Sequence, residues 1–505
     1  MPAGDRRLKQ PTLETILEAT QAFLRASHRP VLVEPGEEPL PLGPDNHRLE
    51  LRDGRLVFEA WEQHRLIVRR LVGLRTGARG RLELIVERFG KRQGNLLLYD
   101  EQRAGSSELR RGRRLVFRER FRLSLRRSFP GWRLADLSAD ADLENSLSGA
   151  FPRAFLVRGA AGWAAIAAPP EARDAAGVLT FGLIWLDYLR RRERRIIVEG
   201  LALFVPEHAT ATTCLRLRHL DPRLARFAVF VLGPEGFEEQ IDPSDFGNLN
   251  TQLEPCPRTP PALPPLARRL ASLAPVESVP AADGTLSFRV RGLEFARLAG
   301  ETLLFGLSRP RAATAADWET IEELVAELDQ LRSPEARDSS HPLFRERPEA
   351  WLESQVRRSL RTIDAALEPE PIYSHVPAIA GADRGIIDLV TADRQGRLAV
   401  IELKASADPH LPLQALDYWM RVRWHSARDE FRTRGYFPGR SLSPATPRLL
   451  LVAPALEFHP TTEILLGALS PEIPVERIGL AADWRRQLRV VFRVAGAARP
   501  GLAGR

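Results

Sequence analysis

The sequence has few cysteines and no long apolar run. It contains two cysteines in 505 residues, Cys214 and Cys256, and no CxxC pair. This composition excludes a zinc site built on several thiolates and argues against a disulfide framework. No stretch approaches the roughly 18 apolar residues that a membrane helix needs, and the first residues, MPAGDRRLKQPTLE, lack the apolar segment of a secretory signal. We therefore expect a cytoplasmic protein without a membrane partner.

Lysine is equally scarce. Of the 73 basic residues only Lys9, Lys91 and Lys404 are lysines, and arginine supplies the rest of a net charge of +8. A basic balance favours a polyanionic partner, although a solvated arginine-rich surface would give the same composition. Lys9 and Lys91 occur in polar stretches, whereas Lys404 occurs in an apolar one. Lysine is a compact ammonium whose pKa can move, so its use at position 404 suggests a chemical role.

A phosphate-binding P-loop is also absent. None of the three lysines sits in a GxxxxGK[ST] motif. The chain is therefore not its own P-loop motor.

The length predicts two to four α/β domains. In chain order we expect an α+β region (1–114), a second domain (115–253), a proline-rich linker (254–265), a connecting α/β segment (266–340), a catalytic domain (341–495) and a flexible tail (496–505). Within the first region, periodicity predicts helices over Leu13–Arg25 and Glu62–Leu74, with a hairpin turn at Asp53-Gly54 between them.

The region from Trp351 onward predicts the order helix, strand, strand, strand, helix, strand. These elements are expected over 351–367, 372–379, 385–392, 397–405, 412–425 and 447–456. Asp388 lies in the first strand of the central hairpin, and Glu402 and Lys404 lie in the second. Residues two apart on a strand face the same side, so Glu402 and Lys404 should share a face.

The neighbours of Glu402 are apolar, which places these charges at the boundary of a core. Buried carboxylates are costly unless they bind a metal or take part in chemistry. Oxygen ligands from Asp388 and Glu402 suit Mg²⁺ or Mn²⁺ rather than zinc. Such an ion polarises a phosphate and lowers the pKa of a water, and a nearby lysine can orient that water.

The pattern Asp388 followed by Glu402-Leu403-Lys404 resembles the signature of the PD-(D/E)xK nucleases. The acidic residue that this family carries on the preceding helix maps onto Glu353. Gln414 and Tyr418 resemble the QxxxY motif of its RecB-like branch, and the overall spacing is similar to the C-terminal domain of NucS/EndoMS mismatch endonucleases. The resemblance is confined to residues 341–495, and Ile387 replaces the proline of the signature.

The resemblance implies a restriction-endonuclease-like αβββαβ core. It implies that Asp388 and Glu402 bind Mg²⁺ or Mn²⁺, that Glu353 completes the site and that Lys404 assists the attacking water. Gln414 and Tyr418 would position the substrate. The alternative for Glu402 and Lys404 is an ordinary salt bridge on a solvent-facing strand, and Glu353, Gln414 and Tyr418 could likewise be ordinary helix residues.

The first half of the chain repeats part of this layout, which suggests a degenerate copy of the same core. The motif LDYLRRR (186–192) resembles LDYWMRV (416–422), and LALFVPEH (201–208) resembles LLLVAPAL (449–456). On this alignment Glu353, Asp388, Glu402 and Lys404 are replaced by Arg122, Arg153, Ala167 and Pro169. The arginines would suit phosphate contacts. Similar composition alone is the alternative explanation.

The sequence therefore predicts a Mg²⁺- or Mn²⁺-dependent nuclease, with DNA favoured over RNA as the substrate. The competing hypothesis is a non-catalytic or partner-dependent nucleic-acid-binding protein on a nuclease fold. Endonuclease and exonuclease action, and roles in repair and in defence, all remain open. A monomer with pseudo-symmetric halves and a homodimer are both compatible with the sequence.

Overall fold

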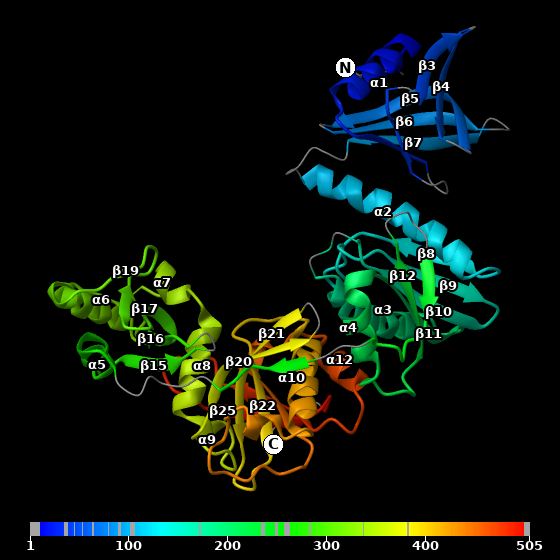
Figure 1. Cartoon of the computed structure of the whole chain (residues 1–505). Coiled ribbons are helices and arrows are strands. Elements are labelled where there is room, and N and C mark those ends of the chain that lie inside the picture. The colour runs from blue at the N-terminus through cyan, green and yellow to red at the C-terminus, as the bar shows by residue number, and fades with distance from the viewer. Residues whose placement is uncertain are drawn as a thin grey trace, which may run out of the picture. The chain divides into compact units, whose positions relative to one another are not determined.

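The structure is a computed structural model of a mixed α/β protein (Figure 1). It describes residues 11–498 except 35–38, 45, 53, 63–64, 79, 89–91, 101–106, 171, 173, 234–237, 248–250, 257–262, 282–283, 337 and 381–382. Lys9, Lys91, part of the expected linker (257–262) and most of the expected tail (499–505) therefore lie outside the described residues. None of the helices described is long and apolar enough to cross a membrane.

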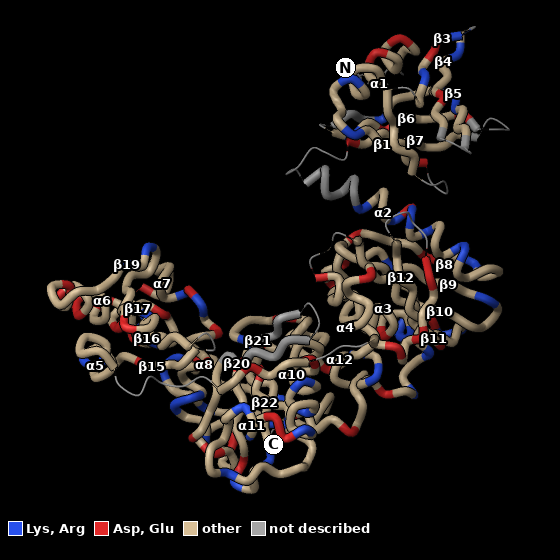
Figure 2. Tube along the Cα trace, in the orientation of Figure 1, with Lys and Arg blue, Asp and Glu red and all other residues tan. Residues whose placement is uncertain are grey.

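The chain divides into two compact units that interleave in sequence. The first comprises Met1–Thr210 and Ala225–Asp242, and the second comprises Ala211–Leu224 and Pro243–Arg505. This division differs from the expected boundaries, because residues 211–224 and 243–253 fall in the second unit. Arg216 illustrates the assignment: its Nη2 lies 2.7 Å from Oδ2 of Asp417. Basic residues occur throughout both units (Figure 2).

The first unit begins with a helix and an antiparallel sheet of order β2-β1-β7-β6-β5-β4-β3. Its elements are α1 (Leu13–Ala26), β1 (Pro30–Val33), β2 (Leu40–Pro41), β3 (His47–Arg52), β4 (Arg55–Glu62), β5 (Arg65–Ala78), β6 (Arg81–Arg88) and β7 (Arg92–Asp100). The helix expected over Leu13–Arg25 is confirmed. The helix expected over Glu62–Leu74 is wrong, because Glu62 ends strand β4 and residues 65–74 lie in strand β5. Exposed Leu66 and Val68 alternate with buried Ile67, the period of a strand.

A second sheet completes the first unit, with order β13-β12-β11-β10-β9-β8. Its elements are α2 (Ser107–Ser128), β8 (Arg133–Ser138), β9 (Arg153–Arg158), β10 (Ala161–Ala167), α3 (Val178–Arg192), β11 (Ile197–Pro206), α4 (Glu207–Leu217, partly in the second unit), β12 (Arg226–Leu232) and β13 (Glu238–Ile241). Strands β10, β11 and β12 run parallel, and the remaining neighbours are antiparallel.

The segment after the expected linker forms a small antiparallel meander in the second unit. It contains α5 (Pro265–Ala271), β15 (Val276–Pro280), β16 (Leu286–Val290), β17 (Leu293–Ala299), β18 (Thr302–Phe305), β19 (Arg311–Ala312), α6 (Trp318–Leu331) and α7 (Pro342–Arg345). Arg332, which is fully buried, donates to the carbonyls of Glu346 and Arg291 and so ties the chain entering the C-terminal domain to the meander.

The C-terminal sheet has the order β14-β20-β21-β22-β23-β24-β25. Its elements are β14 (Thr251–Leu253), α8 (Pro348–Arg358), α9 (Leu360–Ile363), β20 (Tyr373–Ala380), β21 (Asp383–Ala392), β22 (Leu398–Leu403), α10 (Leu411–Ser426), α11 (Glu430–Thr433), β23 (Arg448–Pro454), α12 (Thr462–Ala468), β24 (Val475–Leu480) and β25 (Val490–Ala495). Strand β14 pairs with β20, so residues 251–253 belong to this sheet rather than to the preceding domain.

The strand directions from β20 to β25 repeat those from β8 to β13. Strands β22, β23 and β24 run parallel, and the other neighbours are antiparallel. Helices also fall at corresponding places: α3 and α10 follow the third of these strands, and α4 and α12 follow the fourth.

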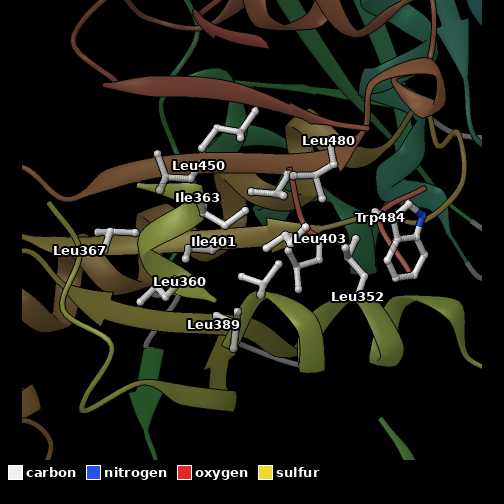
Figure 3. Close-up of a cluster of buried hydrophobic side chains, with 14 of the residues drawn as sticks. Leu352, Leu360, Ile363, Leu367, Leu389, Ile401, Leu403, Leu450, Leu480 and Trp484 are labelled. Carbon is white, nitrogen blue, oxygen red and sulfur yellow. The ribbon is translucent and has the colours of Figure 1, made fainter. Parts of the chain in front are cut away.

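Helices cover both faces of the C-terminal sheet. One face packs Ile401 and Leu403 of β22 against Leu352 of α8 and Leu360 of α9 (Figure 3). The other face meets α10, which contacts β22 and β23. Because side chains alternate along a strand, Val400 and Glu402 point toward the α10 side. Every residue of β22 is buried, so Glu402 is a carboxylate inside a core strand.

Candidate functional site

Two carboxylates face each other on adjacent strands of the C-terminal sheet. The antiparallel register pairs Leu389 of β21 with Ile401 of β22, which places Asp388 opposite Glu402, one position further along. Residues opposite each other on one face lie in close contact. The backbone N–H of Leu403 donates to Asp388 Oδ2 over 2.9 Å, which fixes the orientation of this carboxylate.

Burial makes both carboxylates hard to ionise. Burial raises the pKa of Asp388 to about 6, against the opposing effect of the Leu403 hydrogen bond, and the nearby charge of Glu353 raises it further. Burial, and next the charge of Asp388, raise the pKa of Glu402 well above its usual range, while Lys404 opposes the shift. Two like charges that share a buried site disfavour each other's ionised form unless a cation joins them.

Glu402 lacks the hydrogen bonds that a buried carboxylate normally accepts. Its exposed fraction is 1%, and neither carboxylate oxygen has a hydrogen-bond partner among the described residues. Asp388 can bond to it only when one of the two carboxyls holds a proton, which also raises the pKa of Glu402. A buried polar group without a partner is costly and requires an explanation.

Lys404 is the nearest cation to this pair. Its Nζ lies 3.9 Å from Glu402 Oε1 and 3.7 Å from Oδ2 of Asp408, in the loop before α10. The side chain of Lys404 is 18% exposed, so it lies between the core and solvent. The alternative of a solvent-facing salt bridge does not fit, because the Glu402 side chain is buried.

Glu353 approaches the pair from α8. It is buried, and its carboxylate lies 3.9 Å from Nη1 of Arg357 and 4.0 Å from Nη1 of Arg289, which comes from β16 of the meander. The charge of Glu353 reaches Asp388 strongly enough to raise its pKa. Glu353 therefore belongs to the same electrostatic cluster, with two guanidinium groups beside it.

Gln414 and Tyr418 occupy one face of α10 beside the carboxylates. Gln414 Nε2 donates to the Tyr418 hydroxyl over 3.1 Å. Burial, and next the charge of Glu402, raise the pKa of Tyr418 to about 12. The phenol therefore stays protonated at neutral pH and can donate a hydrogen bond. Positions four apart on a helix are neighbours, and Pro412 in the first turn suits the start of this helix.

The structure thus brings together Glu353, Asp388, Glu402, Lys404, Gln414 and Tyr418. The sequence did not indicate Asp408, Arg289 or Arg357. Asp408 lies four residues after Lys404 but outside a helix, so no periodicity marks it. Arg289 reaches Glu353 from a separate sheet, and no local pattern predicts that contact.

The chemistry of these residues fits a hard divalent cation. Among the described residues, no group of three or more His, Cys, Asp or Glu side chains is arranged to hold a metal ion. Mg²⁺, however, is typically held by one or two protein carboxylates and keeps several waters and substrate phosphates as its other ligands. Asp388 and Glu402 supply two such carboxylates, and the oxygens of Glu402 have no competing donor in the part of the chain that is described.

The register also tests the alignment of the first unit with this site. Glu402 pairs with Leu451, three positions before Pro454, and Ile166 pairs with Leu203, three positions before Pro206. The pairing therefore makes Ile166, not Ala167, the counterpart of Glu402, and Ala168, not Pro169, the counterpart of Lys404. Ile166 pairs with Arg153, which agrees with the expected match of Arg153 to Asp388.

Arg153 is not placed for the phosphate contact expected of it. Its exposed fraction is 6%, its Nη1 donates to the carbonyl of Asp140 over 2.8 Å, and its guanidinium lies 5.5 Å from the Trp185 ring. Burial lowers its pKa. The Arg153 side chain therefore makes its contacts with groups inside the first unit.

No protein-family model matches the chain, and no curated protein matches it either.

Proposed function

We propose that the protein is a Mg²⁺- or Mn²⁺-dependent nuclease that hydrolyses phosphodiester bonds, with DNA as the favoured substrate. The observation that carries the proposal is the Asp388–Glu402 pair. Glu402 is buried and Asp388 is half-buried, both have raised pKa values, and Glu402 lacks a hydrogen-bond donor among the described residues. An arrangement this costly to the fold is expected where a cation and a substrate complete it.

Each residue of the cluster has a proposed role. Asp388 and Glu402 would hold the divalent ion, which when bound polarises the phosphate and lowers the pKa of a water. Lys404, within 4 Å of Glu402, would orient the attacking water and neutralise charge that develops on the phosphate. Glu353 would hold a further water.

Gln414 and Tyr418 would position the substrate backbone. The Tyr418 hydroxyl accepts from Gln414 and keeps its own proton, so it can donate to a phosphate oxygen. Arg289 and Arg357 would hold the Glu353 carboxylate in position, since their guanidinium nitrogens lie 4.0 Å and 3.9 Å from it.

The fold that accompanies this function is a restriction-endonuclease-like core in residues 341–495. The succession α8, β20, β21, β22, α10, β23 supports this assignment. We further propose that the sheet β8–β13 is a degenerate copy of the core. The repeated strand order, strand directions and helix positions support that relation.

Cleavage assays test the proposal. A panel of linear, circular, single-stranded, branched and mismatched DNA, together with RNA, would be incubated with Mg²⁺ or Mn²⁺. Asp388→Asn, Glu402→Gln and Lys404→Ala should each lower the cleavage rate by about a thousandfold, the effect of losing several kcal/mol of transition-state stabilisation. The control is Asp429→Asn, because Asp429 is exposed and its left-handed backbone conformation suits asparagine.

Metal-dependent cleavage that is lost in the three variants and kept in the control would support the nuclease. A wild-type chain that binds nucleic acid without cleaving it, with binding unchanged in the variants, would favour the binding-protein alternative. Cleavage that persists in folded Asp388→Asn and Glu402→Gln would overturn the proposal.

A further inference from the structure

A basic hollow lies beside the C-terminal half of α10. Its volume is about 380 Å³, within the range of small-molecule and cofactor sites. It is lined by α10, by the loop that follows α4 and by the segment before β14, all of which belong to the second unit. Its lining includes four arginines and two large aromatic residues: Arg218, Arg421, Arg423, Arg428, Phe246 and Trp424. We call it the α10 pocket.

The α10 pocket combines unpaired positive charge with aromatic rings. Within the described residues, Arg218, Arg423 and Arg428 form no ion pair with a carboxylate, and Glu472 is the one acidic residue of the lining. Arg428 lies 3.5 Å from the centre of the Trp424 ring and Arg218 lies 5.3 Å from that of Phe246.

Two further features leave the pocket open to an anion. Trp424 is 36% exposed, a high value for the largest apolar side chain. His219, in the same lining, has its pKa lowered to about 4 by burial and by the charges of Arg423 and Arg218, so it is neutral at physiological pH. Among the described lining residues, Glu472 is therefore the one carboxylate beside the charges of Arg218, Arg423 and Arg428.

The pocket is connected to the catalytic cluster through α10. Arg421 lines the pocket, and its guanidinium lies 6.0 Å from the ring of Tyr418. Trp424 follows Tyr418 by six positions, a rise of about 9 Å along a helix.

We propose that the α10 pocket binds one nucleotide of single-stranded DNA beside the catalytic cluster, with the base stacked on the face of Trp424 that Arg428 leaves open and the phosphate held by Arg423 and Arg428. This inference rests on the proposed nuclease function. An aromatic face beside arginines is the combination by which proteins bind single strands without reading sequence. The pocket would therefore favour substrates with an unpaired segment near the cleaved phosphate.

Binding of a short fluorescein-labelled oligo(dT) to the full chain in EDTA, measured by fluorescence anisotropy, tests the inference without cleavage. Trp424→Leu should weaken binding about tenfold, the usual effect of losing one base stack. The double change Arg423→Gln with Arg428→Gln should also weaken it about tenfold and should reduce the dependence on salt by about one phosphate contact. These side chains are exposed, so the variants should fold.

The matched control is Arg432→Gln, because Arg432 is equally exposed but already paired with Asp429 outside the pocket. It should leave the affinity unchanged. Unchanged oligo(dT) binding in Trp424→Leu and in the double variant would overturn the inference, as would equal competition by poly-glutamate, which would indicate attraction by charge alone.

The cleavage and binding experiments distinguish a failure of the nuclease proposal from a failure of the pocket proposal. Loss of cleavage in Asp388→Asn with unchanged binding in the pocket variants would retain the nuclease and remove the pocket. Weaker binding in the pocket variants of a chain that never cleaves would retain the pocket as a single-strand site and remove the nuclease.

Discussion

The sheets β8–β13 and β20–β25 share strand order, strand directions and helix positions but differ at one buried spot. In the C-terminal sheet this spot holds Asp388 and Glu402. In the first unit the paired positions hold Arg153 and Ile166. Ile166 is 1% exposed and packs as an ordinary core residue, and Arg153 is bonded to the Asp140 carbonyl.

The comparison shows whether a carboxylate at this position is required for folding or is explained by function. The sheet of the first unit forms with an apolar side chain at the central position, so no carboxylate is required there for folding. Glu402 occupies the equivalent position at a cost in stability, because it is buried without a hydrogen-bond donor in the described part of the chain. A residue that the fold does not need and that destabilises it is best explained by function.

The largest expected effect comes from moving the acid into the other sheet. Ile166→Glu should lower the free energy of unfolding by about 4 kcal/mol, because it buries a carboxylate opposite Arg153, whose guanidinium is already bonded to the Asp140 carbonyl, and removes apolar packing. Chemical denaturation would measure this change, and Ile166→Val, at about 1 kcal/mol, is the size control. A cost near that of the valine variant would mean that the two positions do not differ as described.

The pH dependence of stability should differ between the sheets. The folded pKa of Asp388, about 6, lies above the value near 3.9 of an unfolded chain. Between these values the folded state binds more protons than the unfolded state, so stability falls as pH rises. Asp388 alone should remove about 3 kcal/mol between about pH 4 and pH 7.

Denaturation of metal-free wild type and Asp388→Asn across this range would show the effect as a difference in slope. Asparagine keeps the acceptor for the Leu403 N–H, so the hydrogen bond survives the substitution. Parallel curves for the two proteins would contradict the assignment of the shift to Asp388. Asp429→Asn should reproduce the wild-type slope.

Metal should stabilise the protein through the C-terminal sheet alone. Mg²⁺ at a hundred times its Kd should raise the free energy of unfolding of wild type by about 2.7 kcal/mol, and Glu402→Gln should show no such gain. Thermal unfolding with and without Mg²⁺ would measure both. In metal-free solution Glu402→Gln should be at least as stable as wild type, since it replaces a carboxyl whose ionisation is opposed by burial and by Asp388. An equal gain in both proteins would place the ion elsewhere.

The smallest effect is expected at a pair of tyrosines. Tyr418→Phe removes the hydroxyl that accepts from Gln414 and should slow cleavage about tenfold, with about 1 kcal/mol lost in stability. Tyr188 occupies the matching place in the LDY motif of α3, where it stacks on Trp185. Tyr188→Phe should leave the cleavage rate unchanged. An equal loss of rate in both variants would indicate a structural role for Tyr418.

Local patterns in the sequence predicted which residues lie side by side within one segment of the chain. A two-residue strand period placed Glu402 beside Lys404, and a four-residue helix period placed Gln414 beside Tyr418. The same reasoning failed at β5, where buried Ile67 and Leu71 are four apart and fit a helix as well as a strand. Pairing with β4 and β6 decides that segment, and pairing is not visible in a short window.

The features that the sequence could not predict depend on contacts between residues far apart in the chain. Arg289 of β16 meets Glu353 of α8, and the α10 pocket is assembled from residues near positions 218, 246 and 424. The alignment of the first unit was displaced by one residue at Glu402. An apolar run such as GWAAIAA contains nothing that fixes its register, whereas the strand pairing does.

The segment Ala211–Leu224 has a consequence for how the gene can be divided. The chain leaves the first unit at Thr210, pairs Arg216 with Asp417, bridges Leu220 to Leu469, and only then supplies β12 and β13. No single cut in the coding sequence separates the two units intact. A truncation within the proline-rich stretch would remove these partners of α10 and α12. An isolated C-terminal fragment is therefore a poor substitute for the full chain. A version of this unit for transfer to another protein must include residues 211–224, through a circular permutation or a grafted loop.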